Sequence, residues 1–171
     1  MLNVKKQITI GILMITAMLV LLSGCSGYQN SWPYPEDVTS VYVEMFDTAS
    51  FRRGYEFELT DAICKRIESH TPYKIVSDRQ LADTVLSGRL SIGISVLAGD
   101  RYSGSSLERE ALTTVTVTWK NLKTGEMLID AKQVEGAASY SQQLGQTEQY
   151  AVARAVNDAA QRVVELMETP W

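Results

Sequence analysis

Two long segments of alternating apolar and polar residues constrain the fold most strongly. Between Leu86 and Val96, every second residue is apolar or glycine, and serine, arginine and glycine stand between them. The segment from Ala111 to Lys120 alternates in a similar way. A period of two places alternate side chains on opposite faces of a strand, so each segment predicts a strand with one buried face. Glycine and serine in residues 99–106 predict a turn between the two strands.

The surrounding sequence predicts three shorter strands, over residues 40–46, 73–76 and 127–134. A polar turn through Asp47-Thr48 is expected after the first of them. Residues 136–146 are rich in Gly, Ser and Gln, a composition that predicts a loop.

Two segments have the period of an amphipathic helix. The first runs from Tyr55 through Ile67 and is ended by Thr71-Pro72. The second carries one apolar stripe from Val152 to Met167, and Pro170 ends it. Alanines in this stripe predict a helix that lies close against a sheet.

The predicted order is β-α-β-β-β-β-α. Each helix is apolar on one side only, so each must cover a sheet. The fold class is therefore expected to be α+β, a two-layer sandwich of one small mixed sheet with both amphipathic helices on one face. Four interior positions are predicted to lie in the core: Ile63, Leu90, Val117 and Val156.

The first residues have the order of a secretory signal. Lys5 and Lys6 precede an apolar run from Ile8 to Leu22, which is shorter than the roughly 20 residues of a membrane-spanning helix. Leu22-Ser23-Gly24-Cys25 resembles a bacterial lipobox. That resemblance implies cleavage before Cys25, a thioether-linked diacylglycerol on its sulfur, and acylation of the new amine. An ordinary signal peptide with an incidental cysteine is the alternative.

The expected domains are a lipoprotein signal peptide over residues 1–24, a lipidated tether over 25–38, and a single α+β domain over 39–171. Ser26, which is not aspartate, resembles the pattern that permits sorting to the outer membrane. We expect a lipid-anchored domain that faces the periplasm. Trp32 and Tyr34 either enter the membrane interface or pack on the domain.

Composition bears on possible partners and on disulfide bonds. Removing Lys5 and Lys6 from the 16 basic residues leaves 14 against 20 acidic ones, a net charge of −6, which argues against a nucleic-acid partner. If Cys25 carries lipid, Cys64 has no disulfide partner and is predicted to be a small core residue.

The sequence contains no recognisable catalytic set. Its single histidine, His70, stands where the first helix is expected to end, which is typical of a solvated residue at a helix C-terminus. No Cys/His spacing suits zinc, and no glycine-rich phosphate loop is present. The carboxylate pairs Glu56/Glu58 and Glu108/Glu110 are interpreted as surface groups. The chain is therefore predicted not to be an enzyme, and neither a metal nor a cofactor is expected.

Several segments together carry a family resemblance. They are a Val-x-x-Phe strand end at Val43–Phe46, the helix segment Glu58-Leu59-Thr60-Asp61-Ala62, the strand entry Ala82–Gly88, the hairpin Val117–Gly125, and the final amphipathic helix. In this order, behind a lipobox, they resemble the lipopolysaccharide-assembly lipoprotein family (LptE-like) over nearly all of residues 38–171.

The resemblance implies a non-enzymatic outer-membrane lipoprotein. Members of this family plug a large β-barrel translocon (LptD-like) that inserts lipopolysaccharide into the outer leaflet. Basic residues in loops at one end of the sheet are expected to contact lipopolysaccharide phosphates, and Arg101 and Arg109 match that placement. Residues 136–146 depart from the pattern because they contain no lysine or arginine. The alternative is a lipoprotein cofactor of a cell-wall synthase, which usually has a longer tether.

Overall fold

The computed structural model describes residues 34, 35, 37–48, 53–99 and 106–168, without the side chains of 106 and 107, and these residues form six strands and two α-helices. The strands are β1 (Ser40–Val43), β2 (Asp47–Thr48), β3 (Lys74–Ile75), β4 (Thr84–Gly99), β5 (Ser106–Asn121) and β6 (Met127–Tyr140). The α-helices are α2 (Tyr55–His70) and α3 (Glu148–Glu165), and the short 3-10 helices are η2 (Arg79–Leu81) and η3 (Gln142–Leu144).

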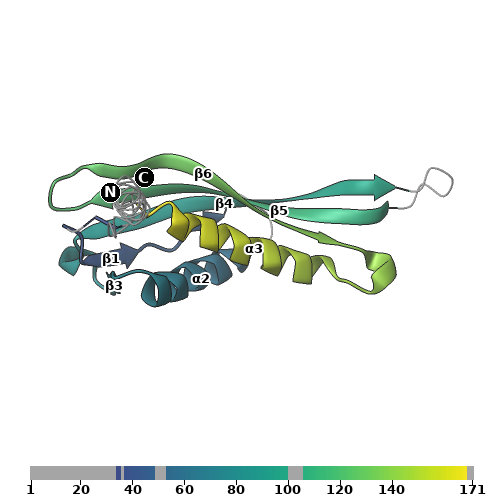
Figure 1. The fold of residues 1–171 in the computed structure, drawn as a ribbon, viewed down its shortest axis with the longest axis horizontal. Coiled ribbons are helices and arrows are strands. Elements are labelled where there is room, and N and C mark those ends of the chain that lie inside the picture. The colour runs from purple at the N-terminus through teal and green to yellow at the C-terminus, as the bar shows by residue number, and fades with distance from the viewer. Residues whose placement is uncertain (1–33, 36, 49–52, 100–105, 169–171) are drawn as a thin grey trace, which may run out of the picture. The chain divides into compact units, whose positions relative to one another are not determined.

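The sheet is mixed. Its strand order is β3-β1-β4-β5-β6, with β2 pairing with β4 outside this path. β1 runs parallel to β3 and β4, whereas β4, β5 and β6 form an antiparallel meander. Both helices lie on one face of the sheet (Figure 1), which confirms the predicted α+β fold. No helix within the described residues is long and apolar enough to cross a membrane.

The predicted strand faces are confirmed. Leu86 and Leu90 of β4 are fully buried, and so are Val115 and Val117 of β5. Arg89, which alternates with them on β4, is exposed. The four predicted core residues, Ile63, Leu90, Val117 and Val156, are at most 1% exposed.

Two sequence predictions about local structure are wrong. Asp47-Thr48 is not a polar turn but the short strand β2, whose two residues pair in parallel with Arg89 and Leu90 of β4. Residues 136–140 are not a loop but the second half of β6, paired with β5 as far as Arg109↔Tyr140. Among these small residues, which suggested a loop, Gly136 leaves room for the helix α3 that packs on the strand.

α3 approaches the backbone of the sheet closely at Gly136 of β6. A Cβ atom on Gly136 would collide with the backbone of α3, at the carbonyl oxygen of Ala155 and the amide nitrogen of Ala159, and would lie 2.9 Å from the Cα of Ala159. Ala155 and Ala159 are fully buried. The alanine stripe of α3 therefore packs directly on the strand backbone, as its small side chains predicted.

Asp83 joins three parts of the sheet at the start of β4. Its Oδ2 accepts hydrogen bonds from the amides of Thr39 and Ser40, both at 3.0 Å, and from the Thr39 hydroxyl at 2.5 Å. Its Oδ1 pairs with Lys123 Nζ of the β5–β6 turn at 2.5 Å. Lys123 and the Thr39 hydroxyl hold the pKa of Asp83 well below its usual range.

Tyr34 packs on the domain. Its ring meets the ring of Tyr73 edge-on, with 5.6 Å between centroids, and Tyr73 lies 5.7 Å from Trp119 of β5. The Tyr34 hydroxyl donates to the carbonyl oxygen of His70 at 3.1 Å. The sequence left two alternatives for Tyr34, the membrane interface or packing on the domain, and the structure shows packing on the domain. Trp32 lies outside the described residues.

Gly136→Ala is expected to destabilise the domain by about 1–3 kcal/mol, because an overpacked core costs about that much. Gly93→Ala on β4 is the matched control: a Cβ there has no heavy atom within 4 Å, so we expect a change within about 0.5 kcal/mol. Urea unfolding of both variants measures the difference. Equal stabilities would contradict the close packing of α3 on Gly136.

Asp83→Asn is expected to lower stability at neutral pH, because the carboxylate interactions are lost. The folded-state pKa of Asp83 is depressed, so its contribution is fully present above the unfolded pKa of about 3.9 and is lost as pH falls below that value. The gap in free energy of unfolding between wild type and variant should therefore narrow from pH 7 to pH 3. Asp130→Asn, at an exposed position of β6, is the control and should show no such gap.

Candidate functional site: the hairpin end of the sheet

The predicted site residues are only partly within the described structure. Cys25 and Arg101 lie outside the described residues, so their roles stay predictions. Arg109 lies on β5, near the end of the β4–β5 hairpin that is farthest from β1 and β3 (Figure 1). The site is therefore built around Arg109.

Arg109 lies on the same face of the sheet as the helices. It pairs with Val96 of β4 and Tyr140 of β6, and it alternates in register with the buried residues Ala111 and Thr113. The Tyr140 hydroxyl donates to Glu148 Oε2 at 3.3 Å, which places this row of residues beside the first turn of α3. The hairpin continues past this level, where the helix no longer covers it (Figure 1).

The guanidinium of Arg109 is not fully satisfied within the described structure. Its Nε atom is buried and has no hydrogen-bond partner among the described residues, although the residue as a whole is half-buried. A buried donor without a partner costs free energy of folding. The described residues therefore give this donor no structural partner, and the half-buried guanidinium can donate hydrogen bonds to an oxygen ligand from outside the domain.

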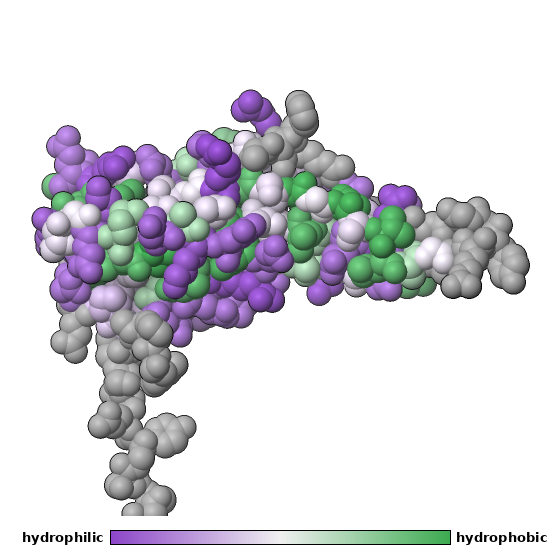
Figure 2. Space-filling view, turned by 90° about the horizontal axis from the view of Figure 1, so that it is seen from above, coloured by the Kyte–Doolittle hydropathy of each residue, from purple (hydrophilic) through white to green (hydrophobic). Residues whose placement is uncertain are grey.

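Large apolar side chains are exposed at the same end of the domain. Val96 and Leu97 of β4 are 58% and 51% exposed, Leu144 of η3 is 78% exposed, and Tyr150 in the first turn of α3 is 58% exposed. Figure 2 shows hydrophobic residues on the narrow hairpin arm next to the residues drawn in grey. We call Val96, Leu97, Arg109, Leu144 and Tyr150 the hairpin-end patch.

A second cation borders this patch. The guanidinium carbon of Arg154 lies 5.9 Å from the centroid of the Tyr150 ring, within the range of a cation–π interaction. Arginine binds phosphate oxygens through two parallel hydrogen bonds, whereas exposed apolar side chains favour hydrocarbon. The hairpin-end patch therefore combines the two properties needed to bind an anionic amphiphile.

Sequence reasoning assigned only Arg109 of this patch to a site, and two of the other members lie where no sequence pattern marks them. Leu144 falls in the segment predicted to be a loop, and Tyr150 precedes the predicted start of the last helix. A single apolar residue in either place carries no periodic signal. Only the continuation of β6 to Tyr140 brings η3 and the first turn of α3 to the hairpin.

The remaining candidate side chains, which are carboxylates and a cysteine, do not form a reactive site within the described residues. Glu56 is buried, contrary to its interpretation as a surface carboxylate, and its Oε2 accepts a hydrogen bond from the Gly54 amide at 2.8 Å. Glu58 is exposed. Cys64 is half-buried rather than part of the core, and burial, followed by Asp61 and Glu68, raises the pKa of its thiol. The described residues contain no group of three or more potential metal ligands.

Comparison with known proteins identifies a matching family. Residues 38–167 match the sequence model of a family that is described as "LptE: Lipopolysaccharide-assembly". No curated protein sequence is significantly similar to the chain.

Three solved structures have a similar fold. Uncharacterized lipoprotein B from Nitrosomonas europaea is 15% identical, with 82% of this chain and 88% of that chain covered and a TM-score of 0.58. Rare lipoprotein B from Shewanella oneidensis is 17% identical, with 75% and 93% covered and a TM-score of 0.52. The PelC dodecamer from Paraburkholderia phytofirmans is 13% identical, with 83% and 98% covered and a TM-score of 0.51. At these identities the similarity shows the fold alone.

Arg109→Met is expected to leave the domain as stable as wild type, within about 1 kcal/mol, because methionine keeps the apolar stem and removes an unpaired buried donor. Thermal unfolding of the two proteins measures this. A large drop in melting temperature would mean that Arg109 is a structural residue.

Proposed function

The chain belongs to the LptE family of lipopolysaccharide-assembly proteins, and we propose that it is an outer-membrane lipoprotein that plugs a β-barrel translocon and assists the insertion of lipopolysaccharide into the outer leaflet. In this proposal the protein binds and positions lipopolysaccharide but catalyses no reaction. Its partners are the barrel, an LptD-like translocon, and the glycolipid.

The proposed anchor is the lipid on Cys25, with residues 1–24 removed and residues 25–38 as the tether. Tyr34, within this tether, packs against Tyr73 of the domain and donates to the His70 carbonyl oxygen. Tyr34 lies nine positions after Cys25, and an extended chain of nine residues spans about 30 Å. The domain would therefore stay within about 30 Å of the membrane surface.

The hairpin-end patch is the observation that carries the glycolipid part of the proposal. Lipid A presents phosphate groups next to acyl chains. Arg109 offers a half-buried guanidinium whose Nε has no partner within the described residues, and Val96, Leu97 and Leu144 offer exposed apolar surface at the same end of the domain. We propose that Arg109 binds a lipid phosphate and that these apolar residues contact the acyl chains. Arg101, in the segment between β4 and β5, is the second proposed phosphate ligand.

Arg109→Glu is expected to weaken lipopolysaccharide binding by at least about tenfold, because it replaces attraction to phosphate by repulsion; a charge-assisted hydrogen bond is worth about 1.5–3 kcal/mol. Arg89→Glu is the matched control. Arg89 is exposed on the other face of the sheet, and its pair with Asp47 at 4.0 Å contributes little. Binding of purified lipopolysaccharide to the full-length protein in detergent measures both variants.

The barrel part of the proposal is tested separately by affinity purification from solubilised outer membranes. Wild type and the Arg109→Glu variant should both bring down one large barrel protein, and depletion should lower surface lipopolysaccharide. Recovery of a cell-wall synthase in place of a barrel would contradict the proposal. Equal lipopolysaccharide binding by wild type and Arg109→Glu would refute the assigned phosphate contact.

A further inference from the structure

Strand β6 is an edge of the sheet. The order β3-β1-β4-β5-β6 leaves β6 at one edge, while the other edge is formed by β3 and, beyond Leu90, by the outer half of β4. β3 has two residues, whereas β6 has 14. The outer side of an edge strand presents backbone N–H and C=O groups that can pair with another chain.

The register identifies which groups of β6 point outward. The Ala137 amide donates to Asp158 Oδ2 of α3 at 3.2 Å, so it points away from β5. Amide directions alternate along an antiparallel strand, and pairing is continuous from Gln133↔Thr116 to Ala137↔Leu112. The amides of Gln133 and Glu135 therefore also point outward, and neither donates a hydrogen bond within the described residues.

The edge is closed on both sides of these two residues. Toward the N-terminus, Ala131 has a φ of 45° and the pairing with β5 shifts register there, which is a bulge of the kind that terminates edge pairing. Toward the C-terminus, Asp158 covers the amide of Ala137. Between these two features, Gln133–Glu135 is an open stretch of the edge.

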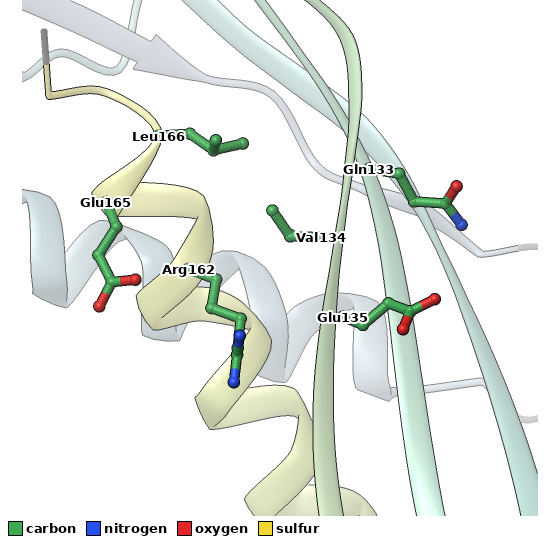
Figure 3. A pocket seen from close by; sticks show the side chains of 6 residues that line it. All are labelled: Gln133, Val134, Glu135, Arg162, Glu165 and Leu166. Atoms are coloured by element: carbon green, nitrogen blue, oxygen red, sulfur yellow. The ribbon is translucent and has the colours of Figure 1, made fainter. Parts of the chain in front are cut away.

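A groove of about 520 Å³ lies beside this open stretch. It is lined by Gln133, Val134 and Glu135 of β6, and by Arg162, Glu165 and Leu166 at the end of α3. Figure 3 shows Val134 pointing from β6 toward the helix, while Gln133 and Glu135 point to the other side of the strand. Val134 and Leu166 are half-buried, so they offer apolar surface to a side chain that enters the groove.

The charges around the groove favour a basic occupant. Glu135 and Glu165 are exposed carboxylates. The one basic residue of the lining, Arg162, already pairs with Asp158, with 3.3 Å between Nε and Oδ2. An incoming cationic side chain beside Glu135 is therefore favoured over an anionic one.

We propose that a short, extended, basic segment of a partner protein adds as a strand to β6 at Gln133–Glu135, with one apolar side chain in the groove between Val134 and Leu166. The backbone groups of Gln133 and Glu135 supply hydrogen bonds that do not depend on the partner's sequence. The groove and Glu135 supply the preference for an apolar and a basic residue at alternate positions. This surface is distinct from the hairpin-end patch and does not depend on lipopolysaccharide binding.

The experiment uses the full-length protein in detergent and two synthetic peptides. The basic probe is acetyl-Thr-Val-Lys-Val-Lys-Val-Thr-amide, and the matched acidic probe has glutamate in place of both lysines. We expect the basic probe to shift the NMR amide signals of Gln133 and Glu135 and to slow their hydrogen exchange. The acidic probe should bind at least about tenfold more weakly.

Two variants separate the backbone contribution from the charge. Glu135→Pro removes an outward amide and keeps the pairing with β5, since proline is tolerated where an edge N–H faces outward; it should lower affinity for the basic probe at least about tenfold. Glu135→Gln keeps the amide, so it should still bind and should reduce the difference between the probes. Circular dichroism confirms that both variants fold.

Three results would overturn the proposal. The first is probe-induced shifts confined to other parts of the sheet. The second is unchanged affinity in a folded Glu135→Pro variant. The third is concentration-dependent protection of the Gln133 and Glu135 amides without any probe, since that would assign the edge to a second copy of this chain.

Discussion

The contact between α3 and the backbone of β6 at Gly136 determines how much of the sheet is covered. Because Ala155 and Ala159 lie against a glycine, the helix axis is close to the strand and its position along β6 is set.

An α-helix of 18 residues is about 27 Å long at 1.5 Å per residue, whereas the 16-residue strands β4 and β5 are about 53 Å long at 3.3 Å per residue. The helix therefore cannot cover the whole hairpin. Val96 and Arg109 lie on the core face of the strands yet remain partly exposed, because the helical layer ends before it reaches the hairpin tip.

Periodicity predicted the parts of the fold whose burial is regular. The alternation around Leu90 and Val117 gave the correct core face, and the stripe on α3 predicted close packing because alanine offers little volume. The same reasoning failed at residues 136–140. Glycine, alanine and serine there have the composition of a loop, and their role as a strand surface that admits a helix depends on tertiary contact. Asp47-Thr48 failed for a related reason: two polar residues become a strand only because β4 offers a free parallel edge beside them.

The candidate sites were predictable to a smaller extent. Arg109 was identified by family resemblance, and the structure adds what resemblance could not supply, the buried Nε and the apolar neighbours. Leu144 and Tyr150 could not be predicted, since an isolated exposed apolar residue is ordinary in any sequence. The edge of β6 was equally inaccessible, because strand order comes from pairing between distant segments. Cys25 and Arg101 rest on sequence patterns alone.

The helix α3 thus leaves two different surfaces, one on either side of its contact with Gly136. Toward its first turn, the short reach of α3 exposes the hairpin-end patch. Toward its last turns, Asp158 accepts a hydrogen bond from the amide of Ala137 and pairs with Arg162. The edge of β6 at Gln133–Glu135, beyond Ala137, stays open. Tyr140 lies five positions after Glu135 along β6, a distance of about 17 Å at 3.3 Å per residue. That separation is larger than a side chain, so an amphiphile at the hairpin end and a strand on the β6 edge can be bound at the same time. A change that shifts α3 along β6 would alter both surfaces together, which makes the Gly136 contact the physical link between them.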